Sequence, residues 1–213
     1  MWADFSAHFN IDGSKLNLDR IDMTTDGAVS HASGDLDFNN WPEMTYAVKS
    51  KVHFQRMREI FFKDEPWVLS GAGDFGGTFH LYKGGHDLVG DFSSPVAGLY
   101  DYRFPSLYGS LHWNRKFFEV TNAGSQFSGG DAAFTFGIAP LGEPTKPTGR
   151  FDVNYYGLDL AQLTDFYQFA GLRFAGRASG HNLLEWPMGK FREHRGDGQM
   201  TVDPPPGIAT QGR

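Results

Sequence analysis

Residues 44–54 read Met-Thr-Tyr-Ala-Val-Lys-Ser-Lys-Val-His-Phe and alternate larger, mostly apolar side chains with small or charged ones. Successive side chains of an extended chain point to opposite faces, so Met44, Tyr46, Val48 and Val52 share one face. A period of two over this length predicts a half-buried β-strand. The same alternation returns at 36–38, 79–82, 88–92, 107–113, 117–121, 132–138 and 151–155.

Turn-forming residues separate these stretches, as at Asp26-Gly27, Lys83-Gly84-Gly85 and Asn122-Ala123-Gly124. Glycine makes up 27 of the 213 residues and phenylalanine 20, a composition typical of short strands joined by tight turns. Many short strands at nearly regular spacing predict a mainly β, antiparallel fold.

Two segments, 54–62 and 160–170, have apolar residues at the spacing of a helix rather than that of a strand. Pro66 ends the first, because the residue before proline is disfavoured in α geometry. Asp159 and Gln162 form a predicted capping box at the start of the second, and Gly171 is its predicted end. The apolar faces of these short amphipathic helices, expected at 54–62 and 160–170, are Phe54, Met57, Ile60 and Phe61, and Leu160, Leu163, Phe166 and Tyr167.

Each predicted helix lies between two predicted strands, which indicates a strand–helix–strand unit repeated near 44–75 and 151–180. A repeat of this kind favours an elongated sheet with helices packed on it. We expect residues 1–13 to be an N-terminal lead-in, 14–202 the repeating segment, and 203–213 a Pro/Gly-rich tail.

The net charge of −6 disfavours a nucleic-acid partner, which would require a basic surface. The absence of cysteine excludes a disulfide scaffold, a zinc ribbon and a thiol enzyme. No apolar run approaches the roughly 18 residues of a membrane helix. The first residues lack the basic and apolar regions of a signal peptide, and we expect the chain to be an internal segment of a longer protein.

No motif predicts catalysis or a cofactor. Residues 71–76 match G-x-G-x-x-G, but residues 77–82 read as a strand where a dinucleotide site needs a helix. His80, His86 and Asp87 could meet across a hairpin at a metal ion, although surface histidines are the simpler interpretation. Neither a G-x-S-x-G elbow nor a recognisable carboxylate pair is present. We therefore expect a protein that is not an enzyme, with no cofactor and no metal.

Large aromatic residues allow two interpretations. Trp41, Trp67, Trp113, Trp186 and the tyrosines near 100–108 could form a sugar-stacking platform, or they could be buried in a core or interface. Residues 99–104, the most aromatic stretch, would be conspicuous on an exposed surface.

The repeated unit resembles the AsmA-like proteins, particularly their TamB branch. The resemblance rests on VNYYGLDLAQLTDFYQFAGLRFAGRASG (153–180), VTNAGSQFSGGDAAFTFGI (120–138) and GDLDFNNWPEMTYAVKSKVHF (34–54). It covers residues 14–202 and consists of hydrophobic rhythm and glycine placement. It implies an open, curved β-groove in the bacterial periplasm, anchored through a part outside this chain. It also implies that the groove conducts phospholipid acyl chains between membranes or assists an outer-membrane assembly protein.

An acyl chain needs a dry trough of apolar side chains, and alternating strands laid side by side produce one apolar face. The same residues could equally fill the core of a β-sandwich. The candidate groove residues are Tyr46, Val48, Val52, Phe79, Leu81, Leu88, Phe92, Leu107, Leu111, Trp113, Phe134, Phe136, Ile138, Val153 and Tyr155. The two helices could cap or plug one side of this trough.

Two other functions remain open from the sequence. A transmembrane β-barrel fits the alternation, but a spanning strand needs about 9–11 residues and the predicted strands are shorter. A carbohydrate-binding β-sandwich would require exposed tryptophans over a cleft, with two carboxylates nearby if it hydrolyses sugars.

Overall fold

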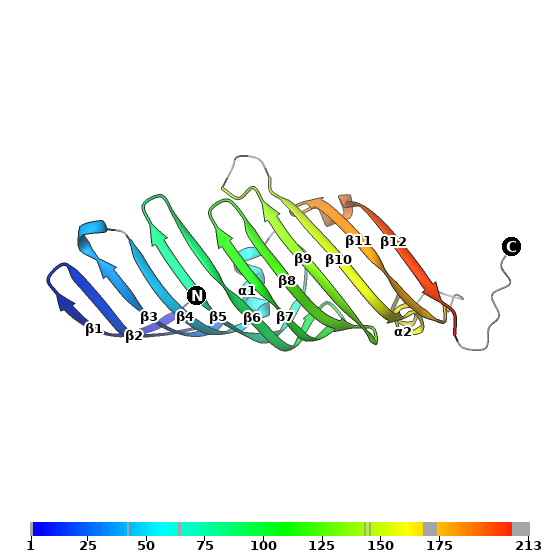
Figure 1. Cartoon of the computed structure of the whole chain (residues 1–213), viewed down its shortest axis with the longest axis horizontal. Coiled ribbons are helices and arrows are strands. Elements are labelled where there is room, and N and C mark those ends of the chain that lie inside the picture. Colours follow the sequence, from blue (N-terminus) through cyan, green and yellow to red (C-terminus); the bar gives the residue numbers. More distant parts are fainter. Residues whose placement is uncertain are drawn as a thin grey trace.

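The computed structural model describes residues 2–41, 43–63, 65–142, 144, 146–167 and 174–205, with the backbone alone at 60–61 and 165–167. Twelve antiparallel strands follow one another in chain order in a single sheet. β1 and β12 are its two edges, so the sheet is open and forms one long twisted ribbon (Figure 1). The predicted fold class, a mainly β open sheet with two short helices, is confirmed.

The first six strands are β1 (Ala3–Asp12), β2 (Lys15–Thr25), β3 (Ala28–Asp37), β4 (Met44–His53), β5 (Leu69–Tyr82) and β6 (Gly85–Leu99). The last six are β7 (Tyr102–Asn114), β8 (Phe118–Phe127), β9 (Gly130–Ala139), β10 (Thr148–Asp159), β11 (Arg177–Pro187) and β12 (Arg195–Asp203). The helices are α1 (Phe54–Phe61) and α2 (Leu160–Tyr167), with short 3₁₀ turns η1 (Phe38–Asn40) and η2 (Phe191–Glu193).

The strand–helix–strand unit occurs twice, as β4–α1–β5 and β10–α2–β11, and in both cases the two strands pair with each other. The sheet begins earlier than expected, because β1 occupies the range predicted as a lead-in. It ends at Asp203, the first residue of the predicted tail. The glycine motif at 71–76 lies inside β5, where Gly71, with a φ of 96°, begins an irregularity in the pairing with β6.

The N-terminus of α2 differs in detail from the predicted capping box. Asp159 Oδ1 accepts hydrogen bonds from the backbone N–H groups of Ala161 and Gln162, at 2.9 and 3.3 Å. Gln162 donates from its side chain to the Asp159 carboxylate at 3.4 Å, and the Asp159 N–H donates to the carbonyl of Ser128. Asp159 therefore caps the helix, but the reciprocal bond of a capping box is absent. The predicted end at Gly171 lies outside the described residues.

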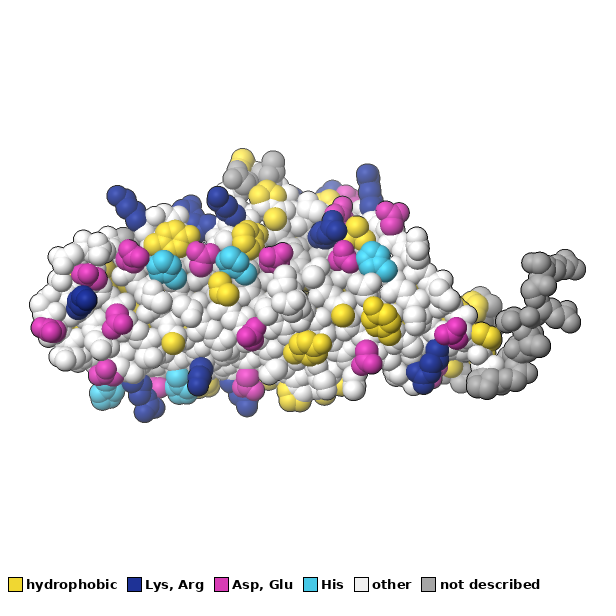
Figure 2. All heavy atoms as spheres, viewed as in Figure 1, with side chains coloured by type: hydrophobic (Ala, Val, Ile, Leu, Met, Phe, Trp, Pro, Cys, Tyr) yellow, Lys and Arg dark blue, Asp and Glu magenta, His cyan; other side chains and the backbone are white. Residues whose placement is uncertain are grey.

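Strand register identifies the two faces of the sheet, since paired residues of neighbouring strands lie on the same face. We call the first the apolar face; one of its rows runs through Ile21, Ala32, Val48, Gly77, Gly90, Leu111, Val120, Phe136, Phe151 and Leu184. The other is the polar face; one of its rows contains His31, Lys49, Gly76, Asp91 and Ser110. Figure 2 shows charged residues and histidines spread over the face turned toward the viewer, with α1 behind it in Figure 1.

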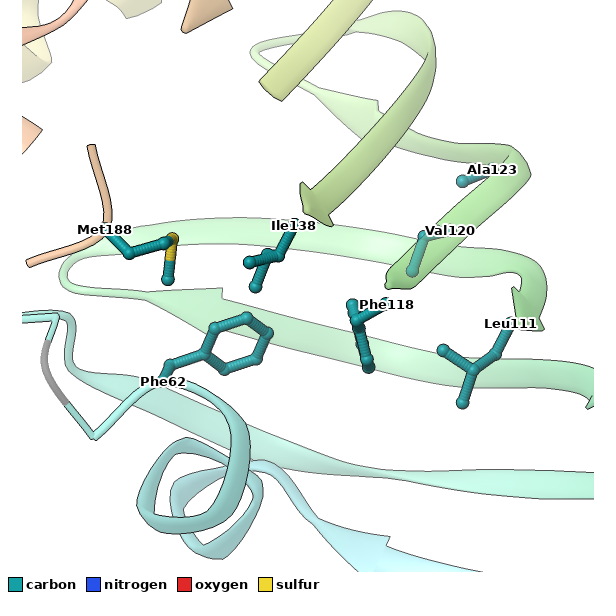
Figure 3. Packing of buried hydrophobic residues seen from close by; sticks show 7 residues of the cluster. All are labelled: Phe62, Leu111, Phe118, Val120, Ala123, Ile138 and Met188. Carbon is teal, nitrogen blue, oxygen red and sulfur yellow. The ribbon is translucent and has the colours of Figure 1, made fainter. Parts of the chain in front are cut away.

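The main hydrophobic cluster lies on the apolar face over the middle strands. Leu111, Phe118, Val120 and Ile138 from β7, β8 and β9 are buried there. Phe62, directly after α1, and Met188, directly after β11, cover them from outside the sheet (Figure 3). Two segments 126 residues apart in the sequence, at Phe62 and Met188, thus complete this core.

Candidate apolar ligand surface

The fifteen candidate groove residues are all buried or half-buried, and none is exposed. They come from β4 to β10, and strand register places them on the apolar face. The alternation in the sequence therefore predicted which side chains share this face. It did not predict which of them the protein itself covers.

The part of the apolar face over β2 to β6 contains a hollow of about 300 Å³. Tyr46, Val48, Phe79 and Leu88 line it, and all four are candidate groove residues. Its remaining lining, which the sequence prediction did not include, is Ile21, Met23, Ser30, Ala32 and Ser50. The hollow is at the lower end of the size range of small-molecule sites, which is about 300–1,000 Å³.

The polar groups in this hollow are neutral or already satisfied. Ser50 donates its hydroxyl hydrogen bond to Ser30 at 2.8 Å, and both serines are uncharged. Burial raises the pKa of Tyr46, so its hydroxyl stays neutral, and it donates to the sulfur of Met44. The hollow is therefore an uncharged surface suited to hydrocarbon.

A larger depression, of about 690 Å³, is lined mainly by residues of the polar face. It contains Lys49, Lys51, Asp74 and Asp91. Burying these charges under a hydrocarbon chain would cost desolvation energy, so the smaller hollow is the better candidate for an apolar ligand.

Part of the apolar face over β7 to β10 is covered by residues 62–63, 65–67 and 186–191, which we call the plug. Trp67 and Trp186 lie with ring centroids 6.0 Å apart, and Trp186 stacks on Phe136 of β9 at 6.2 Å. Phe62 meets Phe118 edge-on at 5.8 Å. The predicted residues under or beside the plug, which are packed in the main cluster, are Leu88, Phe92, Leu111, Trp113, Phe134, Phe136 and Ile138.

Glu65 is the most buried large side chain of the plug, with 1% of its surface exposed. Its Oε1 accepts hydrogen bonds from the Gly189 N–H at 2.8 Å and from Trp186 Nε1 at 3.2 Å. Among the residues that the structure describes, Oε2 has no hydrogen-bond partner. Among the described side chains, no cationic group lies within 4 Å of this carboxylate, so burying it costs free energy. The two hydrogen bonds offset part of this cost and fix how the two parts of the plug meet.

The tryptophans do not form a common platform. Trp186 is buried at 3% exposure and Trp67 packs against it, whereas Trp41 is exposed in the loop before β4. In the aromatic stretch, Tyr100 is exposed and donates its hydroxyl to the Pro66 carbonyl at 2.8 Å. Tyr102 and Phe104 pack on Phe127. Core burial, one of the two interpretations from sequence, holds for Trp186, while Trp67 and Trp113 are partly buried against the main cluster.

The possible metal cluster of His80, His86 and Asp87, which the sequence analysis did not favour, is not assembled. His86 lies between Phe79 and Trp113, while Asp87 bonds to His112 at 2.9 Å. Among the described residues, no group of three or more His, Asp or Glu side chains is placed to hold a metal ion.

Three Asp–His pairs join neighbouring strands on the polar face: Asp22–His31, Asp87–His112 and Asp152–His181. In each pair the hydrogen bond from the histidine is the largest cause lowering the aspartate pKa below 3.8. The aspartates thus favour their charged form in the folded protein.

Because of these three pairs, we expect part of the folding stability to be lost at acidic pH. A carboxyl group whose pKa is lowered by folding stabilises the fold fully at pH values above 3.8, and this contribution disappears as the pH falls through the lowered pKa. We expect Asp87→Asn combined with Asp152→Asn to reduce the difference in unfolding free energy between neutral and acidic solution. Urea unfolding across a pH series measures this difference. Asp131→Asn, which alters an exposed aspartate of β9, is the control, and an equal reduction in it would contradict the assignment.

The sequence predicted the strand residues that lie beneath the plug, but it did not predict the residues of the plug itself. Phe62, Glu65, Trp186 and Met188 were not among the candidate groove residues, although the two predicted helices were considered as a possible cap or plug of the trough. The available signal was the cluster Phe61-Phe62 and Trp67 beside Pro66, with a second cluster at Trp186-Pro187-Met188. Nothing in the sequence relates these two clusters to each other.

Comparison with protein-family models, curated proteins and solved structures finds no match for this chain. Neither helix in the described part of the structure is long and apolar enough to cross a membrane.

Proposed function

We propose that the chain is a non-enzymatic scaffold of the bacterial cell envelope whose apolar face binds the acyl chains of phospholipids. The observation that carries this proposal is the uncharged hollow over β2 to β6. Each methylene group moved from water onto such a surface contributes about 0.8 kcal/mol, so a long chain gains much more than a short one. The resemblance to AsmA-like proteins gives this binding a role, in lipid transfer between membranes or in outer-membrane assembly.

The plug limits where lipid binds. Side chains over β7 to β9 already pack against Phe62 and Met188, so they are not available to a ligand in this conformation. The hollow beside them is lined by side chains of β2 to β6. We therefore assign the acyl chain to the β2–β6 half of the apolar face.

A charge in the hollow should abolish lipid binding without unfolding the protein. Val48→Glu puts a carboxylate among Tyr46, Phe79 and Ala32, where an acyl chain would have to desolvate it. We expect at least a tenfold loss of affinity for a fluorescent phospholipid in a titration, and loss of co-purifying lipid in native mass spectrometry.

The matched control is Ala47→Glu, which adds the same charge one residue away on the polar face. It should bind lipid like the wild type, and circular dichroism should report the same strand content for both variants. Unchanged binding by a folded Val48→Glu variant would exclude the hollow as the lipid site.

A further inference from the structure

The depression of about 690 Å³ lies on the polar face over β3 to β6, on the other side of the sheet from the hollow. Gly76 of β5 lies within it, between its register partners Lys49 of β4 and Asp91 of β6. Lys51 and Asp74, which pair with each other, belong to the adjacent row. The volume is within the range of small-molecule sites, about 300–1,000 Å³. We call this depression, with these five residues, the polar pocket.

The fold does not require the glycine at position 76. An added Cβ there would meet no atom within 4 Å, and the φ of Gly76 is outside the left-handed region. The neighbouring Gly77 and Gly90 differ, because a ring carbon of Phe75 lies 2.8 and 2.7 Å from where their Cβ atoms would be. Glycine inside a strand weakens it, and it often marks a position where a ligand comes close to the backbone. The open space over Gly76 therefore points to a ligand.

Charges of both signs surround this space, with the lysines on β4 and the aspartates on β5 and β6. Within the described part of the chain, the side chains of Lys49, Lys51 and Asp74 form neither an ion pair nor a hydrogen bond. Asp91 accepts one hydrogen bond, from the Ser110 hydroxyl at 2.7 Å. The polar pocket thus has a positive side and a negative side whose charges are available to a ligand.

We propose that the polar pocket binds a zwitterionic group in which two carbon atoms separate a phosphate from a primary ammonium, as in phosphoethanolamine. Lys49 and Lys51 are two residues apart on one face of β4, about 7 Å along the strand, so both reach a single phosphate. Asp74 and Asp91 accept hydrogen bonds from the ammonium. A phosphate alone would leave the two carboxylates facing an anion, and a cation alone would face the two lysines. The sheet separates this pocket from the hollow, so the proposal does not depend on acyl-chain binding.

Filling the space over Gly76 should abolish this binding. Gly76→Val places a side chain where no atom now lies, and valine favours a strand, so the variant should keep its strand content and its urea midpoint. In a titration with glycerophosphoethanolamine followed by NMR, we expect the dissociation constant to rise about tenfold or more. Gly137→Val is the matched control, because it makes the same change on the polar face of β9, between Glu119 and Arg150. It should bind like the wild type.

The two aspartates should determine a preference for the ammonium. We expect the wild type to bind glycerophosphoethanolamine about three- to tenfold more tightly than glycerophosphoglycerol, which has the phosphate but no ammonium. Asp74→Asn combined with Asp91→Asn should remove this preference and leave the fold intact, because an amide oxygen at position 91 still accepts from Ser110.

Vesicles distinguish a membrane lipid from a free molecule as the source of the group. The Val48→Glu variant, in which the hollow is blocked, is the background for this measurement. A lipid source predicts that it sediments with phosphatidylethanolamine vesicles and that adding Gly76→Val prevents this. A free source predicts binding of glycerophosphoethanolamine without binding of the vesicles.

Four results would overturn the proposal. The wild type could show no saturable binding of glycerophosphoethanolamine, or it could bind glycerophosphoglycerol equally well. Gly76→Val could bind like the wild type, which would mean that the probe lies elsewhere. Val48→Glu alone could lose the soluble probe, which would assign its binding to the hollow on the apolar face.

Discussion

Replacing Trp186 by alanine is expected to lower the free energy of unfolding by about 3–5 kcal/mol. The indole is buried, stacks on Phe136 and meets Phe191 edge-on at 5.1 Å. It also lies against Gly149, where an added Cβ would be 2.7 Å from the ring. Since ring and glycine fit this closely, the alanine variant leaves a cavity that the rigid sheet does not close.

Chemical denaturation measures this effect, and Trp41→Ala is its matched control. Trp41 is 60% exposed, so its replacement should change stability by no more than about 0.5 kcal/mol. Phe62→Ala tests whether the plug acts as a unit, because Phe62 and Trp186 share contacts with Trp67 and Phe136. We expect the double variant to lose less than the sum of the two single variants. Equal losses in Trp186→Ala and Trp41→Ala would contradict the packing described for the plug.

The strands were predictable where one face is apolar and the other polar, because that contrast produces a period of two. In β4, Tyr46 and Val48 are half-buried while Ala47 and Lys49 are exposed, as the sequence indicated. β1 has the same pattern in Phe5, Ala7, Phe9 and Ile11, but it lies in the range that was expected to be a lead-in. β12 has a weaker signal, since two of its apolar-face positions are glycine.

What covers the apolar face was not predictable in the same way. The pattern of Leu111 and Ile138, buried in the core, is no different from that of Val48, which lines the hollow. Alternation reports which face a residue lies on, and burial depends on segments that arrive from elsewhere in the chain. The plug combines residues near 62–67 with residues near 186–191, and their contacts span more than 100 positions. The same apolar face therefore contains both a hollow, over β2 to β6, and a packed cluster that residues from outside the sheet cover.

Glu65 supplies the polar link between these two segments, and Glu65→Ala is expected to lower the free energy of unfolding by about 2–4 kcal/mol. The substitution leaves the buried Trp186 Nε1–H without an acceptor, which costs about 1–3 kcal/mol. It also removes the bond from the Gly189 N–H and opens a space next to Trp186. One effect opposes this loss of stability. The alanine variant no longer buries Oε2, an oxygen without a hydrogen-bond partner among the described residues.

Glu65→Gln separates these opposing effects. It retains an oxygen that can accept from Trp186 and Gly189, removes the buried charge, and places an amide N–H₂ where Oε2 has no partner. We expect it to lose less stability than Glu65→Ala when both are measured by urea unfolding. Glu59→Ala, on the exposed side of α1, is the control for removing one carboxylate nearby. If Glu65→Ala were as stable as the wild type, desolvation of the carboxylate would outweigh its two hydrogen bonds, and packing of the aromatic rings alone would join the plug.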